Sequence, residues 1–149
     1  MFSTNTNDHA PVFAQQVILI DTDVKFVWEA LTTIDQWPRW QKHVSQATVH
    51  GAVQAGTAFT WKAGGLTFHS RIHTCEEHRF FGWTGKTIGA SASHNWILTQ
   101  VPEGTRVRVL ESLDGLFPKL FRTRFTRDLE KGMLENLNEL KIRALQLAN

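Results

Sequence analysis

The stretch TRVRVLESLDGLFPKLFRTRFTRDLEKGML, residues 105–134, contains the change of period that decides the fold. Up to Leu113, apolar and polar residues alternate, which is typical of a half-buried β-strand. After Gly115, large apolar residues recur every four positions, as on one face of an α-helix. Pro118 suits the first turn of a helix, so we expect one helix of about 30 residues from there to the C-terminus.

Strand signals fill the region before this helix. Short apolar or alternating segments are separated by turns such as Ala63-Gly64-Gly65 and Pro102-Glu103-Gly104. The expected strands cover residues 44–50, 56–62, 66–75, 79–86, 92–101 and 105–113. Because connections this short can only reverse the chain, the sequence predicts an antiparallel meander.

The N-terminal part adds one strand and two short helices. We expect a strand at 14–21, a helix at 23–33 capped by the Asp21–Asp23 segment, and a second helix at 35–41. Residues 1–13 lack the basic start and apolar core of a signal peptide, and we expect a flexible segment there. Residues 14–149 are then expected to form a single α+β domain.

Composition excludes several classes of protein. The net charge of +2 is too small to make nucleic acid or an anionic membrane the main partner. The longest apolar stretch, Val17–Ile20, is far shorter than the roughly 20 residues of a membrane span, so no membrane insertion is expected. Cys75 has no partner for an internal disulfide. We expect a cytoplasmic protein that holds no cofactor.

The chain is rich in large aromatic residues: six Trp and ten Phe, with no Tyr. Two interpretations are open at this point. The rings either fill a solid core, or they form the wall of an apolar pocket that has few polar groups to orient a ligand.

The order of elements, together with several short motifs, resembles the START/Bet v 1-like (SRPBCC) superfamily, and within it the polyketide cyclase/dehydrase-like family. The motifs are Val27-Trp28, Trp37-Pro38-Arg39-Trp40, Gly56-Thr57-Ala58-Phe59, residues 81–85 (FGWTG), residues 94–98 (HNWIL) and residues 104–115. The resemblance implies a helix-grip fold, in which a curved antiparallel sheet of about seven strands wraps around a long C-terminal helix and encloses an apolar cavity. It does not imply one chemistry, since members include lipid carriers, cyclases, receptors and regulators.

Strand parity predicts which side chains face such a cavity, because alternate residues point to opposite sides of a sheet. The predicted ligand-binding residues share the apolar face of a strand or the apolar stripe of the long helix. They are Phe59, Trp61, Phe68, Trp83, His94, Trp96, Val109, Glu111, Phe121, Phe125 and Leu129.

His94 and Glu111 are the titratable residues on this inner face. One interpretation is an acid/base or ligand-orienting pair, with both residues as candidate catalytic groups. The other is a structural hydrogen bond that satisfies a buried carboxylate. We expect no metal site, because His69 and His73 lie about 13 Å apart along a strand and no zinc-binding motif is present. Cys75 lacks the visible features of an activated nucleophile.

Lys119, Arg122, Arg124 and Arg127 place four positive charges at the start of the long helix, where the helix dipole favours anions. They are either a solvated face or the contact for an anionic ligand or partner. The leading functional hypothesis is a protein that binds a small hydrophobic molecule. The alternatives are a cyclase/dehydratase-type enzyme using His94 and Glu111, or a regulatory module that binds a partner protein. A homodimer is also possible.

Overall fold

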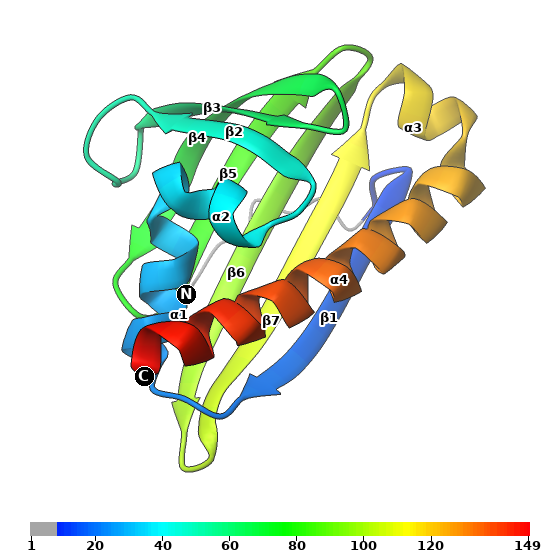
Figure 1. Cartoon of the computed structure of the whole chain (residues 1–149). Coiled ribbons are helices and arrows are strands. Elements are labelled where there is room, and N and C mark those ends of the chain that lie inside the picture. The colour runs from blue at the N-terminus through cyan, green and yellow to red at the C-terminus, as the bar shows by residue number, and fades with distance from the viewer. Residues whose placement is uncertain (1–8) are drawn as a thin grey trace.

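The computed structural model describes residues 9–149 (Figure 1). A single seven-stranded antiparallel sheet runs in the order β1-β7-β6-β5-β4-β3-β2. Its strands are β1 (Val12–Ile20), β2 (Val44–Val49), β3 (Ala58–Ala63), β4 (Leu66–Glu76), β5 (Phe80–Thr87), β6 (Ala90–Val101) and β7 (Gly104–Asp114). The helices are α1 (Val24–Thr32), a 3₁₀ turn η1 (Ile34–Gln36), α2 (Trp37–Trp40), α3 (Leu116–Leu120) and α4 (Arg122–Ala148).

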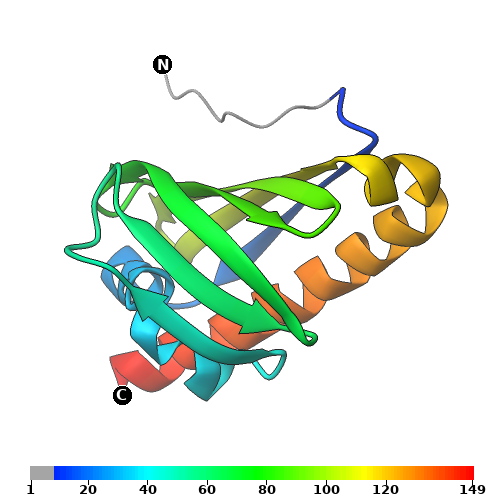
Figure 2. The same ribbon diagram turned by 90° about the horizontal axis from the view of Figure 1, so that it is seen from above.

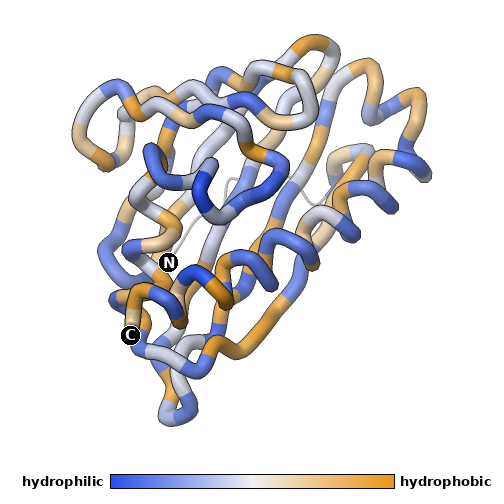
Figure 3. Tube along the Cα trace, viewed as in Figure 1, coloured by the Kyte–Doolittle hydropathy of each residue, from blue (hydrophilic) through white to orange (hydrophobic). Residues whose placement is uncertain are grey.

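The sheet is curved, and its concave side holds the helices (Figures 1 and 2). The long helix α4 crosses this side diagonally, with α1 and α2 beside its C-terminal end. Hydrophilic and hydrophobic residues alternate along α4 (Figure 3), and its buried residues Met133, Leu137, Leu140 and Ala144 follow the helical period toward the sheet. The expected helix-grip architecture is confirmed.

Most boundaries lie within two residues of the expectation, and two differences affect the description of the fold. Strand β1 begins at Val12 rather than residue 14, because Val12 pairs with Leu113 of β7 and is buried at 1% exposure. Residues 12 and 13 therefore belong to the sheet and not to a flexible segment. The rest of that prediction concerns residues 1–11, of which residues 1–8 lie outside the described part of the chain.

The long helix is also not continuous. It breaks at Phe121, whose backbone (φ −120°, ψ 43°) leaves the helical region between α3 and α4. On the N-terminal side of the break, α3 is anchored to the β5–β6 turn: the Phe117 amide donates to the Gly89 carbonyl at 3.2 Å, and the Phe117 ring occupies the space that a side chain at Gly89 would need. The four-residue spacing of apolar residues runs through this break, so it could not be read from the sequence.

No helix within residues 9–149 is both long enough and apolar enough to cross a bilayer.

Candidate functional site

The inner face of the sheet carries the side chains that strand parity predicts. Trp83 of β5, Trp96 of β6 and Val109 of β7 are all buried on the side that faces α4. Arg106 and Arg108 point to the other side of β7 and remain exposed. The alternation of residue types therefore predicts correctly which face of these strands points toward α4. This includes β6, whose two faces are similar in hydrophobicity.

These side chains surround a cavity of about 240 Å³ between the sheet and α4. Seven of the eleven predicted ligand-binding residues line it. They are Trp61, Trp83, His94, Trp96, Val109, Glu111 and Leu129. The structure thus places six of them on the wall formed by the sheet and Leu129 on α4, while their role in binding a ligand stays a prediction.

The other four predicted residues do not line the cavity. Phe59 is 1% exposed and packs under the rings of Trp37 and Trp83, with centroid distances of 5.6 Å and 5.8 Å. Phe68 stacks on Trp61 at 4.5 Å. Phe121 and Phe125 lie instead in a separate surface groove, because the break between α3 and α4 carries this part of the stripe away from the cavity.

Sequence reasoning missed residues from the helices and from the segment that follows α2. The further lining residues are Leu31, Trp37, Gln41, His43, Val44, Ala63, Asp128, Gly132, Met133, Asn136 and Glu139. The lining residues of α4 could have been predicted from the helical period, because Asp128, Gly132 and Asn136 are spaced four residues apart beside the apolar stripe. No sequence signal marks Gln41 or His43, which reach the cavity only through the tertiary fold.

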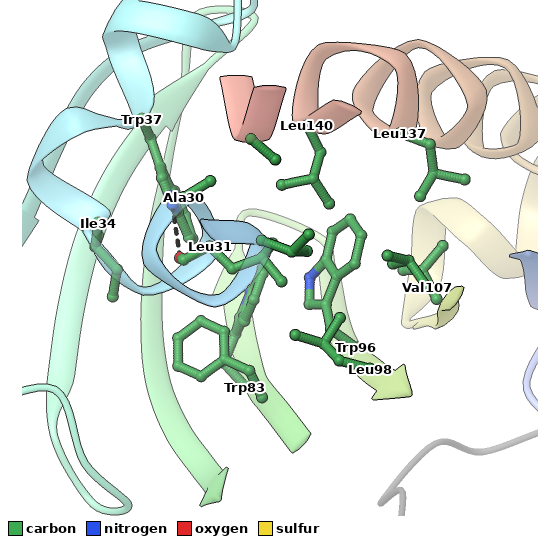
Figure 4. Close-up of a cluster of buried hydrophobic side chains, with 14 of the residues drawn as sticks. Ala30, Leu31, Ile34, Trp37, Trp83, Trp96, Leu98, Val107, Leu137 and Leu140 are labelled. Atoms are coloured by element: carbon green, nitrogen blue, oxygen red, sulfur yellow. Dashed lines mark hydrogen bonds between the residues drawn. The ribbon is translucent and has the colours of Figure 1, made fainter. Parts of the chain in front are cut away.

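Trp37 joins the helical cap to the sheet. Its ring contacts Phe59, Trp61 and Trp83 of the sheet, with ring-centroid distances of 5.3–6.0 Å. Its Nε1 donates a hydrogen bond to the Leu31 carbonyl at 3.0 Å, which Figure 4 shows beside Trp83 and Trp96. The hydrogen bond satisfies the indole N–H, so this ring can be buried at little polar cost.

His94 and Glu111 face each other directly across β6 and β7. His94 Nδ1 lies 3.1 Å from Glu111 Oε2, and both side chains are mostly buried. A carboxylate in this position favours the imidazole tautomer that carries its proton on Nδ1, which leaves the lone pair on Nε2. His94 Nε2 is buried and has no hydrogen-bond partner among the described residues.

Two tryptophan rings enclose the His94 imidazole. Trp83 stacks on it at 4.5 Å with an interplanar angle of 8°, and Trp96 at 5.2 Å with an angle of 25°. The buried Nε1 of Trp96 also has no partner within residues 9–149. This wall of the cavity therefore combines flat aromatic surfaces with two buried nitrogen atoms that have no hydrogen-bond partner in the described part of the chain.

Polar contacts close one rim of the cavity by tying the segment after α2 to α4. Asn136 Nδ2 donates to Gln41 Oε1 at 2.9 Å, and the Lys42 amide donates to Glu139 Oε2 at 2.8 Å. His43 Nε2 lies 3.2 Å from Glu135 Oε2. The hydrogen bond from His43, together with the charge of Lys42, lowers the pKa of Glu135, so this contact persists to mildly acidic pH.

The remaining candidates lie away from this site. His69 is exposed on β4. His73 lies against Gly82 and Asn95 on the face of the sheet that points away from the cavity, and burial lowers its pKa. Burial also raises the pKa of the Cys75 thiol, which keeps it protonated and poorly nucleophilic. Neither histidine nor the cysteine lines the cavity.

Comparison with known proteins gives both a sequence family and a fold. The family model described as polyketide cyclase/dehydrase and lipid transport matches residues 12–144. No curated protein matches the chain. Because every structural match reported below is under 25% identical, each shows the likeness of fold alone.

Three solved structures illustrate that likeness. The hypothetical protein jhp0584 of Helicobacter pylori superposes with a TM-score of 0.82 at 16% identity, covering 97% of this chain and 99% of its own. The Zhui aromatase/cyclase of Streptomyces sp. R1128 gives 0.80 at 13%, covering 92% and 95%. A START superfamily protein of Mycobacterium smegmatis gives 0.78 at 9%, covering 91% and 98%.

Proposed function

Since this chain belongs to the polyketide cyclase/dehydrase and lipid transport family, we propose that it binds a small hydrophobic molecule in the cavity between the sheet and α4. The observation that carries the proposal is the wall of this cavity, which includes four tryptophan rings, Trp37, Trp61, Trp83 and Trp96. Contact with such surfaces contributes roughly 25 cal/mol to the free energy of binding for each Å² of apolar area that a guest buries, before the costs of association are subtracted.

The shape and polarity of the wall narrow the kind of guest. The indole of Trp83 and the imidazole of His94 stack directly on each other, so a guest would lie against the aromatic wall as a whole and not between these two rings. His94 Nε2 and Trp96 Nε1 are buried in the wall, and after a small movement of their rings they would hydrogen-bond a hydroxyl or carbonyl group of a guest. A mostly apolar molecule with one polar end fits this distribution best.

Intrinsic fluorescence tests the proposal directly, because four of the six tryptophans line the cavity. We expect flat hydrophobic molecules from a compound library to change the tryptophan emission and to raise the melting temperature in parallel. A ligand at 100 times its dissociation constant adds about 2.7 kcal/mol to the free energy of unfolding. Such a gain corresponds to a shift of roughly 5–10 °C for a chain of this size.

Both readouts must move together for the proposal to stand. Emission changes without a rise in melting temperature would indicate adsorption to the surface or absorption of light by the compound. A library in which no compound shifts either quantity would contradict the proposal.

The arrangement of His94 and Glu111 supports a second candidate function. In an acid/base enzyme of the cyclase/dehydratase type, Nε2 of His94 would take a proton from an enclosed substrate, and Glu111 would stabilise the resulting imidazolium. The 3.1 Å contact and the buried Nε2, which has no partner within residues 9–149, are the observations that support this second candidate.

Conservative variants separate the two functions. If the pair moves protons, His94→Gln and Glu111→Gln should lower turnover by about 10²- to 10⁴-fold while affinity stays nearly constant. The measurement incubates molecules found in the binding screen with each variant and follows loss of water or ring closure by mass spectrometry. Carriage alone predicts no product with the wild-type protein and only a modest change of affinity in either variant.

A further inference from the structure

One end of the molecule exposes an unusual number of large apolar side chains. Leu116 and Leu120 of α3 are 61% and 64% exposed, Phe121 is 55% exposed, and Ile88 in the β5–β6 turn is 77% exposed. We call this surface, together with Leu66 and Phe117, the α3 tip. Isolated exposed apolar residues are ordinary, but a group of this size marks a surface that binds something.

The apolar residues of the α3 tip are neighbours in space. In both Figures 1 and 2, the β3–β4 turn, the β5–β6 turn and α3 gather at the same end of the molecule. A surface groove is lined jointly by Leu66, Phe117, Phe121 and Phe125. Leu66 also shares a depression with Ile88. The tip is therefore one continuous surface formed by three separate segments.

Basic side chains surround this apolar surface. Lys119, Arg122, Arg124 and Arg127 are exposed on α3 and the first turns of α4, and no acidic residue occurs from Gly115 to Arg127. Within residues 9–149, Arg124 is the only one of the four that forms an ion pair, with Asp128 at 3.8 Å. The net charge of the chain is small because most of the acidic residues lie elsewhere, with Asp114 and Asp128 at the two ends of this basic segment. The local charge at the tip is strongly positive, and the N-terminal end of α4 adds to it.

The tip adjoins the cavity. Asp128 lines both the cavity and the groove of the tip, and the consecutive residues Ala63 and Gly64 line one each. Any surface to which the α3 tip binds would therefore lie next to the end of the cavity that is bounded by the β3–β4 turn and α4.

We propose that the α3 tip docks on the surface of an anionic lipid bilayer, with Leu116, Leu120 and Phe121 in the headgroup region and the basic residues beside lipid phosphates. A mixed apolar and cationic surface is what interfacial binding requires, because each of the two contributions alone is weak. A second copy docked through the same surface would bring two basic clusters together, which opposes association. Nucleic acid would satisfy the charges but not the exposed leucines.

Vesicle co-sedimentation tests the proposal. The full chain should bind vesicles of phosphatidylcholine with one-third phosphatidylglycerol and should bind pure phosphatidylcholine far more weakly. The double variant K119E/R122E should lose at least tenfold in affinity, since each basic residue near an anionic surface contributes about 1 kcal/mol. The double variant L116S/L120S should lose a similar factor, because it removes the apolar contribution.

The chain offers matched controls for both variants. K25E/K141E makes the same change in net charge on exposed residues at the opposite end of the molecule, and I142S alters a side chain that is 58% exposed, like those of the tip. Both should bind anionic vesicles within about twofold of the wild type. All variants should keep the wild-type melting temperature and, without vesicles, any ligand affinity found in the fluorescence screen.

Several outcomes would overturn the proposal. Equal binding to neutral and anionic vesicles, or equal losses in the tip and control variants, would show that the tip does not dock through its charges. Preferential binding of an oligonucleotide by the wild type would point to a different partner. A wild-type dimer that L116S/L120S converts to a monomer would make the tip a self-association surface. Ligand binding can succeed or fail independently of all these outcomes, so the two proposals are separable.

Discussion

Replacing Gly132 with phenylalanine should abolish the binding of hydrophobic molecules without reducing the stability of the fold. Gly132 lies on the face of α4 that lines the cavity, and a β-carbon at this position would meet no atom within 4 Å. A phenyl ring there projects into space that a guest would occupy. Because glycine within a helix costs about 1 kcal/mol relative to alanine, most replacements at this position should stabilise α4.

Gly132→Ala is the matched control for this experiment. It should raise the free energy of unfolding by about 0.5–1 kcal/mol and leave affinity within a few-fold, since a methyl group fills little of the cavity. Fluorescence titration of both variants with a ligand from the screen gives the comparison. If Gly132→Phe binds that ligand as tightly as the wild type, the guest does not occupy the cavity beneath α4.

Replacing Trp37 with alanine should cause the largest loss of stability of any single change at the site, about 3–5 kcal/mol. The indole is 2% exposed and contacts three aromatic side chains of the sheet, so its removal leaves a void where η1, α2 and the sheet meet. The change also leaves the Leu31 carbonyl without the hydrogen bond from Nε1, which adds to the cost.

Urea unfolding followed by circular dichroism measures this effect, and Trp28→Ala provides the comparison. Trp28 lies on α1 and is only partly buried, with edge contacts to Phe81 and His78, so its loss should cost clearly less. A cost below about 1.5 kcal/mol for Trp37→Ala, or a larger cost for Trp28→Ala, would contradict the central role assigned to Trp37.

The sequence predicts the sheet well because side chains along a strand alternate between its two faces with a period of two residues. Alternation placed Trp83, Trp96 and Val109 on the inner face, and it also put His94 and Glu111 on that face, where the structure shows them paired with a 3.1 Å contact. The resemblance to the START/Bet v 1-like superfamily supplied what period alone cannot, namely that the sheet wraps around the last helix. The family match to residues 12–144 confirms that resemblance.

The wrong and missing predictions at the site concern features that leave no periodic pattern in the sequence. The apolar spacing continues through Phe121 although the backbone turns there, so Phe121 and Phe125 were assigned to the cavity and lie instead in the groove of the α3 tip. Gln41 and His43 reach the rim only through contacts with α4, which are distant in sequence. The basic cluster was visible in the sequence, but only the fold places Ile88 and Leu66 beside it.

The position of β1 has a consequence for how the chain folds. Strands β2 to β7 each pair with the next strand along the chain, so they can assemble through local hairpins. Strand β1 instead pairs with β7, and its partners Val12 and Leu113 are about 100 residues apart. Closing so long a loop costs conformational entropy before any contact repays it, which slows folding. The addition of β1 is therefore the expected late step, and α4, which packs on β1, finds its complete binding surface only after that step.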